Sequence, residues 1–383
     1  MVSSLAELFA GLLARLLAGL LARLQDLRLT VALLFNYQRT KRLLIVTTGT
    51  KMLITPPYLL FIGNATDPLS IKMARSAADW SPEKCLGEYR LDGCTVTTGC
   101  PVMSVEAAAR EGAKSFVLGF ANSGGHLSPE WLPTIITALD AGMDIVSGLH
   151  DKLTDFPELV SQAEKVGKRL IDIRHPTARF KTATGGKRAG KRLLAVGTDC
   201  SVGKMYTALA LTKALNQRDV KATFRATGQS GILVAGNGVA IDCVISDFIS
   251  GAAEGLSPAN DSDHWDVIEG QGSLSHPAFA GVSLGLLHGS QPDALVVCHA
   301  LGRSHMRGLP HYPQPSIAHT IDLNLTHARL TNPDAKVVGI AVNTSSVSEQ
   351  EALAVCQRLA EEFQLPCADP IRHGVKAIVD NLL

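Results

Sequence analysis

The hydrophobic pattern from about residue 55 onward alternates short, β-rich apolar runs with amphipathic stretches of helical period. Ser104 and Ser128 stand at positions where helix N-caps are expected. Strands are predicted at residues 59–62, 115–118, 144–146 and 170–173, and helices from about residue 70 and at 104–112, 129–141 and 156–166. This alternation is typical of parallel α/β architecture and predicts a Rossmann-like domain over residues 41–181.

A second series of strands follows a polar, glycine-rich stretch at residues 182–190, which we interpret as a linker. Its strands are predicted at residues 193–196, 222–226, 267–268, 294–298 and 336–342. A chain of 383 residues is longer than one compact core usually supports. The fold class predicted is therefore α/β with two domains, the second a P-loop NTPase-like domain with a parallel sheet over residues 191–383.

The first 40 residues form a separate, leucine-rich segment in which leucine pairs recur every four residues. This spacing predicts a strongly apolar helical extension with a narrow polar stripe through Arg15 and Arg23. Glu7 and the interrupting Arg15 disfavour a secretory signal. A membrane span would bury both arginines at about 2.5–3.5 kcal/mol each. We expect the segment to pack on the body of the protein or on a partner, with interfacial membrane attachment as the alternative.

Charge and cysteine usage exclude several classes of partner. The net charge is +1, and no Lys/Arg cluster is dense enough for a nucleic-acid surface. The 8 cysteines form no CxxC pair and no zinc-type spacing, which favours a reducing compartment. We therefore expect a cytoplasmic protein that forms a homo-oligomer, without a transmembrane segment and without nucleic acid, acting on a small molecule.

A glycine-rich loop at residues 197–204 stands between the strand predicted at 193–196 and a helix predicted at 205–215. Its glycines let successive backbone N–H groups point inward, and the helix N-terminus adds partial positive charge. Lys204 would neutralise phosphate directly, a residue that an ordinary glycine turn does not require. The cofactor-binding candidates are Gly197, Thr198, Asp199, Cys200, Ser201, Val202, Gly203, Lys204 and Met205.

The loop departs from the usual pattern at the residue after the lysine. That position normally carries Ser or Thr, whose hydroxyl binds Mg²⁺. Met205 offers a thioether, which is a poor ligand for a hard cation. Thr207 or a second acidic residue could compensate. The substitution leaves phosphate binding intact and disfavours phosphoryl transfer.

Further polar groups follow other predicted strands and are expected at the same sheet edge. Glu269 ends the strand at 267–268 and would serve as a metal ligand or a base; Asp247 could join it at a metal or cap a helix. In the Rossmann-like domain, segments 122–126, 148–150 and 174–176 would bring three histidines and Arg174 to one rim. Ordinary polar loops are the alternative interpretation of that rim.

Four segments together closely resemble the D-glutamate N-acetyltransferase family: residues 197–205, 226–231, 247–254 and 269–277. The resemblance extends from about Tyr58 to the C-terminus and leaves the leucine-rich segment outside it. More distantly, the C-terminal domain is similar to dethiobiotin synthetase and related P-loop ligases. In those proteins the loop binds ATP, an acidic residue matching Glu269 holds Mg²⁺, and an asparagine matching Asn343 contacts adenine.

The first resemblance implies acetyl transfer from acetyl-CoA to the amine of D-glutamate. Such chemistry requires a base, for which Glu269 and His276 are the candidates, and oxyanion donors, for which the amides of residues 270–272 are available. A thioester relay through Cys200 is conceivable, although a loop-filling cysteine is the simpler interpretation. Carboxylates of the substrate would be bound by arginine, and the candidates are Arg174, Arg303 and Arg372.

The second resemblance keeps an alternative open, an ATP-dependent ligase or kinase that acts on a small carboxylate. That activity requires Mg²⁺ held by Asp247 and Glu269 without help from residue 205. A nucleotide sensor without catalytic activity is a third possibility, but it would not explain two ligand-facing rims.

Overall fold

The computed structural model describes residues 54–120 and 125–383, so the leucine-rich segment and residues 122–124 lie outside the described part. The N-terminal sheet has five parallel strands in the order β2-β1-β3-β4-β5. The strands are β1 (Tyr58–Gly63), β2 (Cys85–Arg90), β3 (Ser115–Leu118), β4 (Asp144–Ser147) and β5 (Leu170–Asp172). The α-helices are α2 (Lys72–Trp80), α3 (Val105–Arg110), α4 (Leu132–Asp140) and α5 (Pro157–Val166), and short 3₁₀ turns include η1 (Pro68–Ile71), η2 (Pro82–Lys84), η4 (Pro129–Trp131) and η5 (Leu153–Asp155).

The C-terminal sheet has six parallel strands in the order β13-β12-β9-β6-β8-β7. The strands are β6 (Lys191–Gly197), β7 (Ala222–Arg225), β8 (Trp265–Ile268), β9 (Ala294–Ala300), β12 (Lys336–Asn343) and β13 (Cys367–Ala368); β10 (His305–Met306) and β11 (Leu309–Pro313) form a separate antiparallel hairpin. The helical elements are α6 (Lys204–Asn216), α7 (Gln229–Ala235), η6 (Ile241–Cys243), η7 (Ser246–Phe248), α8 (Ile249–Leu256), α9 (Ala280–Ser290), α10 (Ile317–Ala328), α11 (Glu349–Phe363) and α12 (Lys376–Leu382). The predicted fold class is confirmed.

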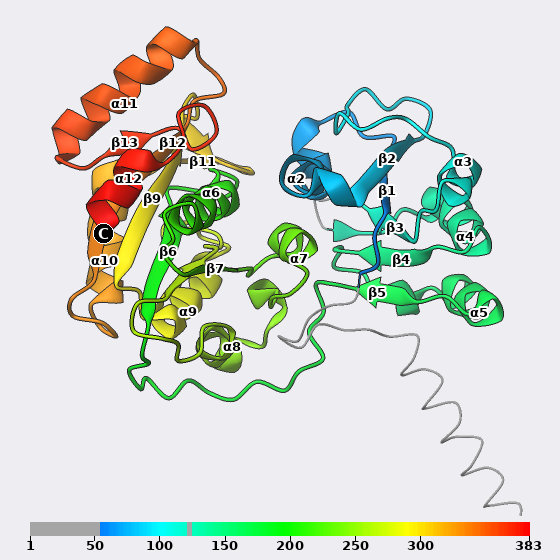
Figure 1. The fold of residues 1–383 in the computed structure, drawn as a ribbon, viewed down its shortest axis with the longest axis horizontal. Coiled ribbons are helices and arrows are strands. Elements are labelled where there is room, and N and C mark those ends of the chain that lie inside the picture. Colours follow the sequence, from blue (N-terminus) through cyan, green and yellow to red (C-terminus); the bar gives the residue numbers. More distant parts are fainter. Residues whose placement is uncertain (1–53, 121–124) are drawn as a thin grey trace, which may run out of the picture.

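The two sheets share a central layer of helices. Alternate side chains of β1 point to opposite faces: Leu59 and Phe61 pack with α3, α4 and α5, whereas Leu60 and Ile62 pack with α2. The same core cluster continues through α6, α7 and α12 to Leu193 of β6. Figure 1 shows α2 and α7 lying between the two sheets. Helices α8 to α11 cover the far face of the second sheet.

The connection between the two sheets is attached to the second one. The backbone N–H groups of Thr184 and Gly185 each donate to the Glu254 carboxylate of α8, at 2.9 Å. Gln291 Nε2 donates to Gly185 O at 2.9 Å. The stretch predicted as a polar linker at 182–190 is therefore anchored at its middle, although its side chains are largely exposed.

Within the described residues, no helix combines the length and apolar character needed to cross a membrane. The order of the sheets places the loop after β6 at a reversal of connectivity, because β8 flanks β6 on one side and β9 flanks it on the other. Ligands of open parallel sheets bind at such positions, beyond the carboxyl ends of the strands. The loop between β6 and α6 therefore lies where this class of sheet binds its ligands.

Candidate active site at the junction of the two sheets

The loop from Gly197 to Lys204 has the backbone geometry of an anion-binding nest. Ser201 and Gly203 both have positive φ, 53° and 101°, and Gly203 immediately precedes α6. Within the described residues, the backbone N–H groups of Ser201, Val202 and Gly203 donate to no protein acceptor. Unpaired, converging N–H groups at a helix N-terminus form a site for phosphate or another anion.

An arginine from outside the loop holds this conformation. Arg303 donates to the carbonyl oxygens of Cys200 and Ser201, both at 2.7 Å, and to Asp199 Oδ2 at 3.2 Å. The buried Asp199 also accepts from its neighbour Cys200 N at 2.6 Å and from Arg307 N at 2.8 Å. Arg303, predicted from the sequence as a substrate ligand, thus has its guanidinium engaged by the loop itself.

Lys204 lies in the interior of the site. Its side chain is buried, and its Nζ donates to Asp199 O at 2.8 Å. Burial lowers the pKa of Lys204, while the nearby Cys200, Asp199 and Glu269 act in the opposite direction. The ammonium has a neutral carbonyl as its hydrogen-bond acceptor, so its charge remains available for an anion in the nest.

The residues considered for a magnesium site make other contacts or lie on the surface. Met205 packs against the shared core cluster. The Thr207 hydroxyl donates at 3.0 Å to the carbonyl oxygen of Gly203, the N-cap of its own helix, and accepts from Cys298 Sγ at 3.5 Å. Asp247 is exposed on η7. Among the described residues, one group of three or more has metal-ligand spacing, Asp199, Cys200 and His276, and it contains neither Asp247 nor Glu269.

Glu269 follows β8 and is placed at the start of α7. Its Oε2 accepts from Thr227 N at 2.9 Å and from Gly228 N at 3.2 Å. A side chain at Gly231 would collide with this carboxylate oxygen, so the residue admits Glu269 by lacking a Cβ. Burial raises the pKa of Glu269 to about 7, against the opposing influence of those two backbone hydrogen bonds and of Lys204 and Lys72. A carboxyl group with a pKa near neutrality is suited to proton transfer.

His276 presents a buried donor toward the loop. The side chain is 2% exposed, and its Nδ1 accepts from Ala278 N at 3.2 Å. With Nδ1 as an acceptor, the proton of a neutral imidazole lies on Nε2. Nε2 has no hydrogen-bond partner in the described structure, and one of the two ring nitrogens lies within 4.8 Å of ligand atoms of Asp199 and Cys200. This tautomer makes Nε2 a buried donor without an acceptor among the described residues.

Side chains of the first sheet's helices reach across to the loop domain. Tyr206 Oη donates to Asp79 Oδ2 at 2.7 Å, and Lys84 Nζ donates to Val234 O at 3.1 Å. Trp80 lies edge-on to Tyr206, with ring centroids 5.7 Å apart. These contacts fix the C-terminal end of α2 against α6 and α7.

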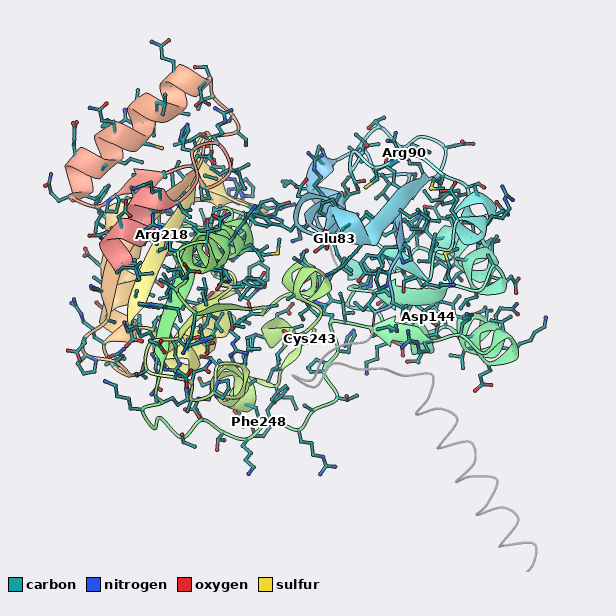
Figure 2. All side chains as sticks on the ribbon, in the orientation of Figure 1. Glu83, Arg90, Asp144, Arg218, Cys243 and Phe248 are labelled. Atoms are coloured by element: carbon teal, nitrogen blue, oxygen red, sulfur yellow. The ribbon has the colours of Figure 1, made fainter. Side chains whose placement is uncertain are left out.

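Arg174, another predicted substrate ligand, bridges the same junction. Its guanidinium forms an ion pair with Asp242 of η6 and donates to Gly148 O at 3.4 Å. Figure 2 shows Cys243, the residue after Asp242, between the two sheets. Burial lowers the pKa of His150, and Arg174, His175 and His126 are among its charged neighbours. The rim expected at the strand ends of the first domain therefore faces the second domain.

The two remaining candidates have their side-chain hydrogen-bond partners outside the loop. Asn343 ends β12, and its side-chain oxygen accepts from Ser345 N at 3.0 Å. Arg372 donates to Val347 O at 3.0 Å and forms an ion pair with the exposed Glu349 at 3.5 Å. The structure brings Lys204, Glu269 and His276 to the loop, and it does not bring Arg372 there.

Two cationic residues of the site were not predicted from the sequence. Lys72, the first residue of α2, has Arg307, Arg174 and Lys204 as its charged neighbours, and burial lowers its pKa. Arg307 NH1 donates to Ser201 Oγ at 2.7 Å. A lysine at the start of an amphipathic helix and an arginine in the turn of the β10–β11 hairpin have no local signature, so only the packing of the two domains brings them together.

Comparisons with known proteins agree with this architecture. Family models for the domain of unknown function DUF1611 match residues 89–176 as a Rossmann-like domain and residues 179–379 as a P-loop domain. A protein from Pseudoalteromonas sp named D-glutamate N-acetyltransferase is 65% identical over 331 residues, which are 86% of this chain and 100% of that protein. A protein of the same name from Tritonibacter scottomollicae is 50% identical over 330 residues, covering 86% and 99% of the two chains. The crystal structure of a DUF1611 family protein from Anabaena variabilis has 32% sequence identity and a TM-score of 0.78, and the match covers 86% of this chain and 99% of that one.

Proposed function

The chain belongs to the D-glutamate N-acetyltransferase family, and from this premise we propose that it transfers an acetyl group from acetyl-CoA to the amine of D-glutamate. The observation that carries the proposal is the 65% identity to a protein of that name over that protein's entire length. The site adds the chemistry: an anion nest for the donor, a base with a pKa near neutrality, and a buried donor beside the loop.

We assign the loop from Gly197 to Lys204 to the phosphates of acetyl-CoA. The unpaired N–H groups of the loop and the Lys204 ammonium supply positive charge without a metal ion. Met205 lacks the hydroxyl that would position Mg²⁺ for phosphoryl transfer, a step that acetyl transfer does not include. Asn343, at the end of β12, remains the proposed contact of the adenine ring.

We assign Glu269 as the base that takes a proton from the ammonium of D-glutamate. Its Oε2 is held by two backbone N–H groups, and Oε1 accepts no hydrogen bond within the described residues. Removing the proton frees the nitrogen lone pair, which attacks the carbonyl carbon of the thioester. The nitrogen then loses a second proton as the C–S bond breaks, and the CoA sulfur leaves as a thiolate that takes up one proton, so the reaction releases one proton overall.

We assign His276 Nε2–H to the oxyanion that forms on the thioester carbonyl during this attack. Its tautomer makes Nε2 a donor, and its burial keeps water from competing for that proton. Backbone amides of residues 270–272 are the further candidates for this task. Of the two bases predicted from the sequence, the structure thus favours Glu269 for proton removal and His276 for charge stabilisation.

The test is a coupled assay of CoA release with purified protein, acetyl-CoA and D-glutamate, with mass spectrometry of the product. We expect N-acetyl-D-glutamate to form at full rate in excess EDTA. L-glutamate and D-aspartate serve as acceptor controls, and ATP with Mg²⁺ replaces acetyl-CoA in a parallel reaction. Substrate-dependent release of inorganic phosphate that EDTA abolishes would instead support the ATP-dependent ligase or kinase.

A further inference from the structure

Three cations that influence the Cys200 thiol have no carboxylate ion pair of their own within the described residues. Lys72, Lys204 and Arg307 all favour the thiolate form of Cys200, although burial raises the pKa of that thiol overall. Lys204 donates to a carbonyl and Arg307 to a hydroxyl. Within the described residues, the Lys72 ammonium has no hydrogen bond and no ion pair.

The acidic groups around these cations do not neutralise them. Asp199 is bonded to Arg303 and to backbone N–H groups, and Asp242 is paired with Arg174. Glu269 faces both Lys72 and Lys204, but its pKa of about 7 leaves it only partly ionised at neutral pH. Cations brought together in a partly buried site repel one another unless an anion is bound.

Lys72 differs from the other two cations because it belongs to the first domain. It opens α2, a helix of 9 residues, where the macrodipole disfavours a positive charge. Its ammonium nonetheless has two cations of the loop domain, Arg307 and Lys204, as charged neighbours, together with Arg174. Both the helix end and the neighbouring cations oppose a lysine here, so a bound anion would relieve all of these repulsions.

We propose that Lys72 and Arg307 form the binding site for a carboxylate of D-glutamate, across the junction of the two domains. This inference rests on the proposed function, because it assigns the acceptor of that reaction. We assign the loop amides and Lys204 to the phosphates of the donor, whereas Lys72 comes from α2 of the first domain and is a charged neighbour of Cys200. Lys72 also neighbours Glu269. A carboxylate held by Lys72 would therefore bring the amine of the same small molecule to the base.

The experiment is isothermal titration of the full chain with D-glutamate and, separately, with CoA. We expect Lys72→Met to weaken D-glutamate binding about tenfold or more, the range for loss of a charged hydrogen bond, and to leave CoA binding unchanged. Lys72→Arg keeps the charge and should recover part of the affinity. Arg307→Gln provides a second, independent variant and should act in the same direction.

Lys84→Met is the matched control. It removes another lysine that crosses the same junction, from η2 to Val234 O, without touching the cation cluster. Circular dichroism and thermal unfolding confirm that each variant folds. Unchanged D-glutamate affinity in Lys72→Met, equal weakening in Lys84→Met, or a loss confined to CoA would overturn the inference; the last result would assign Lys72 to the donor's phosphates.

The two proposals fail in different ways. Wild-type protein that binds D-glutamate but does not acetylate it would refute the proposed function, and the titrations would still decide the role of Lys72. If the wild-type protein acetylates D-glutamate and both Lys72→Met and Arg307→Gln keep the wild-type KM for D-glutamate, the carboxylate site alone is refuted. Wild-type protein that does not bind D-glutamate refutes both.

Discussion

The two sides of the candidate active site differ in whether their groups are already held by hydrogen bonds within the protein. On the loop side, Arg303 and Asp199 bind the loop through hydrogen bonds within one domain, so the nest is held in place before any ligand arrives. On the α2 side, Lys72 has the cations Arg307, Arg174 and Lys204 among its neighbours and makes no hydrogen bond within the described residues. The loop side is preorganised, whereas the cation on the α2 side lacks a partner that a bound anion would supply.

This difference suggests a division of labour between the domains. A preorganised nest binds phosphates with little loss of conformational freedom, and this binding does not depend on the acceptor. A cation from the neighbouring domain can select the acceptor without altering the loop. The comparison therefore predicts that variants of the loop domain change donor binding or chemistry, whereas variants of α2 change acceptor binding.

The largest effect is expected for Glu269→Gln, which keeps the shape and the hydrogen-bond acceptor but removes the proposed base. We expect kcat to fall by about 10²–10⁴-fold. Because a base must be ionised to act, the wild-type kcat/KM should rise with pH through about 7 and then level off. In Glu269→Gln that rise should disappear. A variant that retains the wild-type rate would assign proton removal to another group.

Lys204→Met should come next, since it removes the charge of the nest and keeps an apolar stem of similar volume. We expect CoA binding to weaken by about 10–100-fold, measured by titration. The ammonium also holds down the pKa of Glu269. The pH at which kcat/KM rises should therefore shift above about 7. Unchanged CoA affinity would contradict the assignment of the loop to phosphate.

Arg303→Met should have a smaller effect, because it loosens the nest without removing any group that contacts the donor. We expect KM for acetyl-CoA to rise about tenfold, while KM for D-glutamate changes little, which would distinguish a positioning residue from a substrate ligand. Arg218→Met is the matched control: it breaks an exposed ion pair with Asp380 in the same domain. A rise in KM for D-glutamate alone would show that Arg303 binds the acceptor.

The smallest effect is expected for Met205→Thr. A hydroxyl at this position would serve a magnesium ion, and acetyl transfer gives that ion no task. We expect kcat to change by less than about twofold in either direction, with or without EDTA, which steady-state assays can measure. A gain in turnover that requires Mg²⁺ would indicate that the loop acts on ATP.

The sequence predicted most of the fold because parallel sheets are buried on both faces. Their strands are apolar runs, and β3 was predicted at the residues where it lies. Ser104 is confirmed as an N-cap, since its Oγ accepts from Ala107 N at 3.1 Å, whereas Ser128 makes no such bond. Strand β2 was missed because it contains a glycine and charged residues, among them Glu88, which is buried against Thr98.

Prediction of the site was limited by contacts between distant segments. The loop and Glu269 were recognisable because strand ends of one sheet meet at one edge. Arg303 was placed with the substrate because sequence does not reveal that its guanidinium folds back onto loop carbonyls more than 100 residues away. The sequence does not predict Lys72 as a site residue, because a lysine in an amphipathic helix usually faces solvent. The domain boundaries at residues 41, 182 and 191 stay predictions.

The core cluster that runs between the sheets bears on how this protein unfolds. Met73 of α2 and Ile232 of α7 belong to the same buried apolar cluster, which continues to Leu60 on one side and Leu193 on the other. Separating the two sheets would expose that surface to water, at a cost comparable to opening the interior of a single domain. The two sheets are thus separate in strand order, but they share one apolar core and are not expected to unfold independently. Heat or denaturant should melt both halves in one cooperative transition, and neither half should fold alone.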